Sequence, residues 1–278
     1  MPFFLIVSSQ VAASRVGGMA QVLALQPVGV DAALVPTVLF GRHPGWGPPG
    51  GAAVDAAVMA GMLEGIEAQG LFAHTDAVVT GYFSNADQVE VAADAIARVR
   101  AANPKALVMV DPVLGDEGKG LYVKPEVAEA VRDRLVPLAD VIAPNRFELG
   151  WLAGEATPDT AEAAIALARR IGKPALVSSI PGGADEIGVL YAARHGAWLA
   201  LHARAVAVPN GTGDVLTALF AAALIAGAPP PTALFRAVAA VAELVQAALA
   251  WDAPELPIVA AAPRLLAPTA PVRLEILS

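Results

Sequence analysis

A glycine-rich turn followed by a carboxylate begins the long apolar run GTGDVLTALFAAAL at residues 211–224. Gly211 and Gly213 permit tight or left-handed backbone geometry. The helix predicted after them has unpaired N–H groups at its positive dipole end, which is typical of a phosphate-binding site. Beside these amides, Asp214 can accept the proton of an attacking hydroxyl while the amides neutralise charge on a phosphoryl group. Alternatively, Asp214 only stabilises the first helical turn, by ~0.5 kcal/mol.

Acidic residues also follow two other predicted strands. Asp111 ends the run LVMVD, and Asp116 comes shortly after it. Asn145 and Glu148 begin the helix that follows the next strand. The carboxyl ends of parallel strands form the ligand-binding edge of open α/β sheets, and clustered carboxylates there suit Mg²⁺ together with phosphates and water. Asn145 and Glu148 equally fit an N-cap and its capping-box partner, so both interpretations stay open.

Alternating short apolar runs and amphipathic stretches predict the elements that position these residues. The alternation indicates an α/β fold with a mostly parallel sheet and helices on both faces, and no linker divides residues 1–278, which are predicted to form a single domain. A hairpin is expected around Arg194–Gly196. Strands are predicted at Phe3–Val7, Ala33–Phe40, Ala77–Thr80, Leu107–Val110, Val141–Ala143 and Leu176–Ser178; helices are predicted from Met19, over Val54–Gln69, from a Ser84 cap with Asp87 as its partner to Ala102, from Pro125, from Asn145, and over Asp214–Ala226, Thr232–Ala250 and Leu256–Leu266.

Composition excludes several functional classes. Of the 278 residues, 56% are hydrophobic and 16% charged, the net charge is −8, and there is no cysteine. The charge argues against nucleic acid or an anionic membrane as a partner, and the lack of cysteine excludes disulfides and thiolate sites. The apolar run Val215–Phe235 is interrupted by Gly227 and three prolines, and the beginning of the sequence, MPFFLIVSSQ, lacks the basic region of a signal peptide. We therefore expect a cytoplasmic protein.

Four segments together resemble a known family. They are TGYF (80–83), ANPKALVMVDPVLGDEGKGLYV (102–123), PLADVIAPNRFEL (137–149) and GTGDVLTALFAAAL (211–224). In this order and spacing they are similar to pyridoxal kinases of the ribokinase superfamily. The resemblance implies a ribokinase-like three-layer αβα sandwich, a homodimer, and transfer of the γ-phosphoryl group of ATP to the 5′-hydroxyl of pyridoxal, and usually also of pyridoxine and pyridoxamine.

The same resemblance implies roles for individual residues. Asp214 matches the catalytic base, and the three residues before it, Gly211, Thr212 and Gly213, match the anion hole. ATP and Mg²⁺ are the implied co-substrate and metal, and the need for a monovalent cation stays open. Positions that match nucleotide contacts are Asp111, Asn145, Glu148, Ser178, Ser179, Thr212 and Gly213; those that match acids around Mg²⁺ are Asp111, Asp116 and Glu148; and those that match the pyridine pocket are Ser9, Val16, Phe40, His43 and Tyr82, together with Asp214.

The segment FGRHPGW (40–46) departs from the family's usual F-S-N-H-T-G-Y. Arg42 replaces an asparagine, and Pro44 replaces a threonine and so removes a hydroxyl and an N–H donor. Gly18 also stands where asparagine is usual. The preferred vitamer therefore stays open. One alternative is a kinase of hydroxymethylpyrimidine or another small alcohol, although such kinases carry cysteine at the position of Asp214. Another is a non-catalytic B6 binder, which would need neither a base nor metal-binding acids.

Overall fold

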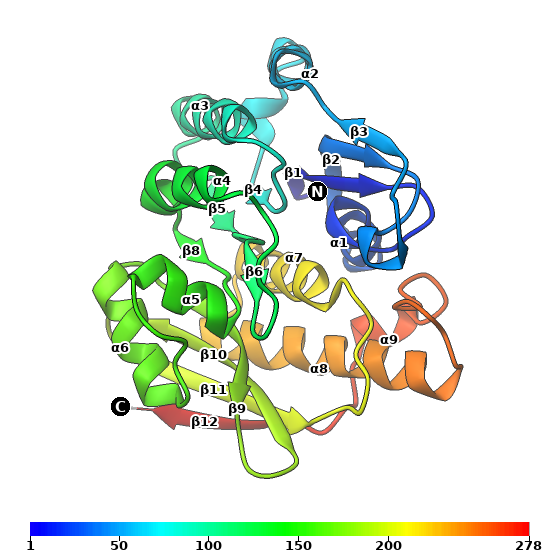
Figure 1. The fold of residues 1–278 in the computed structure, drawn as a ribbon, viewed down its shortest axis with the longest axis vertical. Coiled ribbons are helices and arrows are strands. Elements are labelled where there is room, and N and C mark those ends of the chain that lie inside the picture. Colours follow the sequence, from blue (N-terminus) through cyan, green and yellow to red (C-terminus); the bar gives the residue numbers. More distant parts are fainter. Residues whose placement is uncertain (278) are drawn as a thin grey trace.

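The computed structural model describes residues 1–277, and its centre is one large β-sheet (Figure 1). A separate two-stranded ribbon lies beside the sheet. The sheet strands are β1 (Phe3–Val11), β2 (Asp31–Phe40), β3 (Gly51–Ala53), β4 (Ala77–Thr80), β5 (Leu107–Val110), β8 (Val141–Ile142), β9 (Ala175–Pro181), β10 (Glu186–Ala193), β11 (Gly196–Ala203) and β12 (Arg273–Leu277), and the ribbon consists of β6 (Gly115–Asp116) and β7 (Gly120–Leu121).

The middle of the sheet is parallel and its two edges are antiparallel. The strand order is β12-β11-β10-β9-β8-β5-β4-β1-β2-β3. The strands from β9 to β2 in this order all run parallel, whereas β10, β11 and β12 at one edge and β3 at the other run antiparallel to their neighbours. The predicted parallel sheet and the hairpin, in which Ala193 pairs with Gly196, are both confirmed.

Helices cover both faces of this sheet, as Figure 1 shows. Side chains alternate between the two faces, so that Leu5 and Val7 pack with one set of helices, and Phe4 and Ile6 pack with the other. This confirms the three-layer αβα sandwich. On the first face lie α2 (Ala56–Ala68), α3 (Ala86–Ala102), α4 (Pro125–Ala130), α5 (Arg146–Ala153) and α6 (Ala161–Ile171); on the second lie α1 (Gly17–Leu25), α7 (Thr212–Ile225), α8 (Pro230–Ala250) and α9 (Ala262–Leu266).

Helix α8 is long and apolar enough to span a membrane by length and composition alone. However, 67% of its most apolar window is buried within the protein. It begins at Pro230, two residues before the predicted Thr232, because proline is favoured in the first turn of a helix, where its missing N–H has no intrahelical partner. A helix that lies largely within a protein core can match a membrane span in length and composition, and the burial of α8 fits that description.

Two predictions about helix ends are wrong. The cap of α3 is Asn85 rather than Ser84, because the Asn85 side chain accepts the Gln88 N–H at 3.0 Å while the Gln88 side chain accepts the Ser84 N–H, also at 3.0 Å. The predicted helix Leu256–Leu266 is reduced to α9, because the residues before it form turns that bury Leu256 and Ile258. Strands β3, β6, β7 and β12 were not predicted, since three of them have only two or three residues and β12 follows a helical run.

Candidate active site

The N-terminus of α7 presents unpaired main-chain donors. The first hydrogen bond of this helix runs from Val215 N to Gly211 O at 3.1 Å. Within residues 1–277, the four preceding N–H groups, from Gly211 to Asp214, donate no hydrogen bond. Gly211 has φ +93°, and a Cβ added to it would lie 2.7 Å from the Arg15 carbonyl oxygen, so only glycine fits here. These amides are therefore available to an anion.

Asp214 lies on the first turn of this helix and lines the same cleft as the free amides. One of its carboxylate oxygens, Oδ2, accepts the Gly17 N–H at 2.8 Å. Burial raises the pKa of Asp214 to about 6, although the bond from Gly17 acts in the opposite direction. A carboxylate with this pKa is ionised at neutral pH and is a stronger base than an exposed aspartate, as general base catalysis requires.

Gly17, the first residue of α1, was not predicted as part of the site. Its φ is +58°, and an added Cβ would lie 2.0 Å from Ser9 Oγ. Any side chain would therefore clash with Ser9 of β1 and displace the Gly17 N–H that Asp214 accepts. The paired glycines Gly17 and Gly18 between a strand and a helix were the only sequence signal for this close approach.

Asp111 follows β5 and is almost fully buried. Its Oδ2 accepts a hydrogen bond from Thr217 Oγ1 at 3.0 Å. Burial, followed by the nearby carboxylates of Glu148 and Asp214, raises the pKa of Asp111 well above its usual value. Thr217 was also not predicted, and its only signal is the helical spacing of three residues that places it on the same side of α7 as Asp214. The site thus holds a surplus of negative charge.

Asn145 and Glu148 form the capping box of α5. Asn145 Oδ1 accepts the Glu148 N–H at 2.9 Å, and Glu148 Oε2 accepts the Asn145 N–H at 2.8 Å. Glu148 Oε1 also accepts the Leu114 N–H at 2.7 Å. Burial nevertheless raises the pKa of Glu148 to about 7. The structural interpretation of this pair is therefore confirmed, and it places the Glu148 carboxylate beside the segment that follows Asp111.

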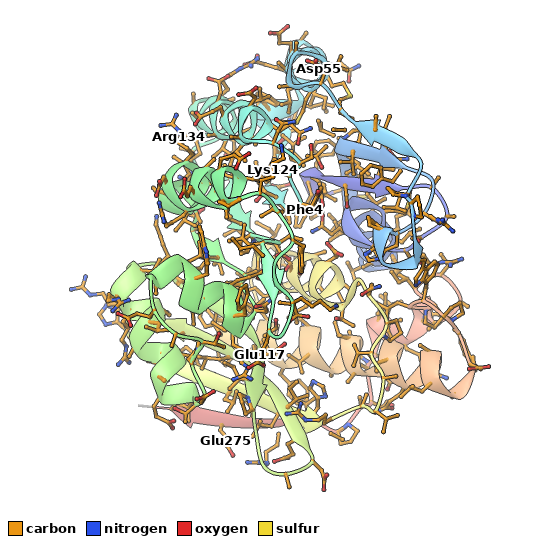
Figure 2. The ribbon with its side chains drawn as sticks, viewed as in Figure 1. Phe4, Asp55, Glu117, Lys124, Arg134 and Glu275 are labelled. Carbon is orange, nitrogen blue, oxygen red and sulfur yellow. The ribbon has the colours of Figure 1, made fainter. Side chains whose placement is uncertain are left out.

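The β6–β7 ribbon lies over the edge of this site. Asn145 Nδ2 donates to the Gly115 carbonyl oxygen at 2.8 Å and ties the ribbon to α5. Figure 2 shows Glu117 at the turn of the ribbon, where it pairs with Arg146. Asp116 and Lys119 from the same ribbon line the cleft. The ribbon therefore brings one acid and one exposed cation to the binding edge.

One cleft of about 590 Å³ joins the α7 amides and Asp214 with Asp111, Asn145, Glu148 and the ribbon residues Asp116 and Lys119. Hydrophobic side chains of α7 and α8 form one wall, with Leu216, Val241 and Val245 among them. A flat apolar ring suits this wall, and an anion suits the end with the free amides. The cleft is lined by every residue predicted to contact the nucleotide or Mg²⁺: Asp111, Asp116, Asn145, Glu148, Ser178, Ser179, Thr212 and Gly213, together with Gly211 and Asp214.

The five residues predicted for the pyridine pocket do not line this cleft. They follow or lie near the carboxyl ends of β1, β2 and β4, and Ser9 lies against Gly17. His43 Nδ1 accepts the Gly45 N–H at 3.1 Å, and burial lowers the pKa of His43, so the ring is neutral. The structure therefore separates two sets of predicted residues, and the second set is Ser9, Val16, Phe40, His43 and Tyr82.

Across residues 1–277, no group of three or more His, Asp or Glu side chains is arranged to hold a metal ion alone. Mg²⁺ typically takes only one or two carboxylates and completes its shell with phosphates and water. Asp111 fits this use, because Thr217 engages its Oδ2, and its pKa is raised first by burial and then by the nearby carboxylates of Glu148 and Asp214, which a cation would offset. Glu148 already accepts three main-chain N–H bonds and has little capacity left for a direct metal bond.

Comparison with known proteins gives consistent matches. The phosphomethylpyrimidine kinase family model matches residues 54–258. Pyridoxal kinase PdxY of Corynebacterium diphtheriae is 36% identical over 261 residues, which cover 92% of each chain. Pyridoxal kinase PdxY of Rubrobacter xylanophilus is 37% identical over 276 residues, which cover 97% of this chain and 94% of that protein. A solved structure of pyridoxal kinase from Leishmania donovani in complex with ADP and pyridoxamine is similar over 100% of both chains, with a TM-score of 0.93 and 27% identity.

Proposed function

The chain belongs to the phosphomethylpyrimidine kinase family, where its relatives include pyridoxal kinases, and we propose that it transfers the γ-phosphoryl group of ATP to the 5′-hydroxyl of pyridoxal. The observation that carries this proposal is the juxtaposition of Asp214 with the unpaired amides of residues 211–214. A phosphoryl group bound by these amides is within reach of an alcohol whose proton Asp214 accepts.

Asp214 acts as the general base. The Gly17 N–H fixes one oxygen, Oδ2, at 2.8 Å and so leaves the other oxygen, Oδ1, to face the hydroxyl. As the hydroxyl oxygen attacks the γ-phosphorus, its proton moves to Asp214 and the bond to the β-phosphate oxygen breaks. ADP leaves with the charge of that oxygen.

The amides at the start of α7 neutralise the charge that grows on the transferred group. They are held in place before the reaction because Gly211 packs against the Arg15 carbonyl. Main-chain donors that are fixed in advance lower the barrier without reorganisation, and each is worth about 10²–10³ in rate. The apolar wall from α7 and α8 supports the assignment of the adenine ring to that side of the cleft.

Mg²⁺ fits the acidic end of this cleft. We infer that Asp111 would hold it, with Asp116 and Glu148 acting through bound water. When bound, Mg²⁺ supplies a positive charge that offsets the charge of the phosphates. The negative charge of the carboxylates repels the phosphates, so the phosphates bind at the amides rather than among the acidic side chains.

The pyridine ring belongs on the side of Gly17 that faces away from the cleft. We infer that Phe40 and Tyr82 pack against the ring and that His43, which is neutral, donates from Nε2. The family resemblance further supports a cytoplasmic homodimer. Sedimentation analysis tests the dimer, since a monomer at micromolar concentration would contradict it.

An ADP-release assay with ATP, Mg²⁺ and a panel of alcohols tests the proposed reaction. We expect release with pyridoxal, pyridoxine or pyridoxamine and formation of the 5′-phosphate, and a reaction without alcohol measures background hydrolysis. A higher kcat/KM for hydroxymethylpyrimidine than for all three vitamers would favour the alternative kinase. Vitamer binding without ADP release would favour a binding protein.

A further inference from the structure

Three consecutive residues connect Asp214 to a distant part of the chain. Gly17 donates its N–H to Asp214, and the Arg15 carbonyl lies against Gly211 at the start of α7. Val16, between them, is buried. The Arg15–Gly17 segment therefore touches both the base and the turn that presents the amides, and its position determines how they are arranged.

Glu255 holds this segment in place. Its Oε2 accepts two hydrogen bonds from Arg15, one from the main-chain N–H at 3.1 Å and one from Nη1 at 3.2 Å. The Glu255 side chain is only 8% exposed, whereas that of Arg15 is 49% exposed. The exposed guanidinium contributes little because water screens it, so the main-chain bond is the stronger constraint.

Glu255 is itself rigidly anchored. It lies between α8 and α9 in a segment without regular structure, and the neighbouring Leu256 and Ile258 are fully buried. The turns that replaced the predicted helix at Leu256–Leu266 are what bring the Glu255 carboxylate to Arg15. A helix there would direct this side chain elsewhere.

We propose that Glu255 is a positioning residue for phosphoryl transfer, acting through the Arg15–Gly17 main chain to hold Asp214 and the α7 amides in their reactive arrangement. This rests on the proposed role of Asp214 as the base. Glu255 does not touch the cleft and contacts no reacting atom. Loosening it lets Gly17 withdraw from Asp214, and a displacement of ~1 Å near the reacting atoms can cost ~10² in rate.

The charged and titratable groups that face Asp214 come from several elements. They are Asp111 at the end of β5 and Tyr122 after β7, while Lys119 on the ribbon lines the same cleft. Arg15 and Glu255 are joined to each other next to Gly17 in the chain, and the Glu255 charge also acts on His43, whose pKa it raises, so that Glu255→Gln separates this charge effect from loss of the Arg15 bond. Of these contacts, the Gly17 N–H is the one that Glu255 controls, and its loss removes an interaction that favours the ionised carboxylate. The acidic limb of the pH profile, the range in which kcat falls as pH decreases, should then move to higher pH.

The test compares two buried glutamates that each anchor a loop. Glu243 Oε1 accepts the Thr269 N–H at 2.8 Å and the Thr269 hydroxyl at 2.7 Å, away from Asp214. We expect Glu255→Ala to lower kcat about 10–100-fold, to leave the KM for ATP within about twofold, and to raise the acidic limb by about 0.5–1 pH unit. Glu255→Gln keeps an oxygen that can accept the Arg15 N–H and should stay close to the wild-type enzyme. Glu243→Ala should lower the melting temperature without moving the acidic limb.

Two outcomes would overturn the proposal. In the first, Glu255→Ala has the same kcat as the wild-type enzyme and loses activity at the same acidic pH. In the second, Glu255→Ala and Glu243→Ala shift the acidic limb equally. If Glu255→Ala does not fold, Glu255→Asp withdraws the carboxylate by one methylene and is measured in the same way. Asp214→Asn is measured in parallel. Normal turnover in Asp214→Asn would show that Asp214 is not the base, whereas normal turnover in Glu255→Ala alone would reject only the positioning role of Glu255.

Discussion

The two sides of Asp214 differ in how their polar groups are used. On the side of the cleft, the N–H groups of residues 211–214 make no hydrogen bond to the described protein. On the other side, the loop after β2 satisfies its own polar groups. Arg42 donates from its main-chain N to Pro49 O and from Nε to Pro48 O, and His43 accepts from Gly45.

This difference separates the reaction from the choice of alcohol. In the proposed mechanism, the free amides and the raised pKa of Asp214 serve phosphoryl transfer to any alcohol that reaches Asp214. The loop at residues 40–50 is held by its own hydrogen bonds and carries departures from the family pattern that include Arg42 and Pro44. Changes on the cleft side should therefore alter kcat, and changes in the loop should alter which alcohol is used.

Beyond Asp214 itself, the largest effect is expected from Gly211→Ala. The added Cβ would lie 2.7 Å from the Arg15 carbonyl oxygen at φ +93°, so the amides must move, and a left-handed alanine alone costs about 1–2 kcal/mol. We expect turnover to fall by about 10²–10³. Gly172→Ala is the control, because it has φ +79° with open space around it and lies outside the cleft. Equal turnover in the two variants would show that the amides do not matter.

The pH dependence should separate activity from stability. Asp214 must be ionised to act, so kcat should fall about tenfold per pH unit below about pH 6, where its pKa lies. Folding raises the pKa of Asp214, of Glu148 (to about 7) and of Asp111, so these three groups bind more protons in the folded protein than in the unfolded chain between about pH 4.5 and 7, and they outnumber His43 and His202, whose pKa values burial lowers. The melting temperature of the ligand-free protein should therefore rise as pH falls from 7 to 5.5. If kcat and the melting temperature both fell as pH decreased from 7 to 5.5, the raised pKa values assigned to these carboxyl groups would be contradicted.

Glu148→Gln should have a smaller effect, on the metal requirement. We expect the Mg²⁺ concentration for half-maximal rate to rise several-fold, because one acid near the phosphates is neutralised. The variant also turns an NH₂ group toward main-chain N–H donors now bound by the carboxylate, which should lower stability by about 1–3 kcal/mol. A lower melting temperature with unchanged Mg²⁺ dependence would limit Glu148 to its capping role.

The double variant Arg42→Asn, Pro44→Thr should have the smallest effect on turnover. It restores an N–H and a hydroxyl to the loop, and one hydrogen bond is worth ~1 kcal/mol. We expect the ratio of kcat/KM between pyridoxal and pyridoxine to change by about 3–10-fold, with an unchanged KM for ATP. A change in the KM for ATP of the same size would contradict the separation of the two sides.

The sequence was most informative where function depends on a short local pattern. The turn at Gly211 and the acid at Asp214 are adjacent in the chain, and helix geometry alone predicts their relation. Asp111 and Glu148 follow parallel strands, whose carboxyl ends necessarily meet at one edge. These predictions needed no knowledge of distant contacts.

The contacts that were missed all join distant segments. Gly17 and Asp214 are 197 positions apart, and Arg15 and Glu255 are 240 apart. No local propensity encodes such pairs, because the first results from α1 packing beside α7 and the second from the segment between α8 and α9 reaching the start of α1. The same is true of Thr217 and Asp111, which are 106 positions apart. The fold class was therefore predictable, whereas the support around the base was not.

The turnover number of Asp214→Asn, measured together with ADP binding, decides whether Asp214 is the general base. The amide keeps the shape of the side chain but cannot accept the proton of the hydroxyl. We predict that ADP binds with near wild-type affinity and that turnover falls by about 10²–10⁴. Wild-type turnover in a folded variant that binds ADP normally would contradict the account.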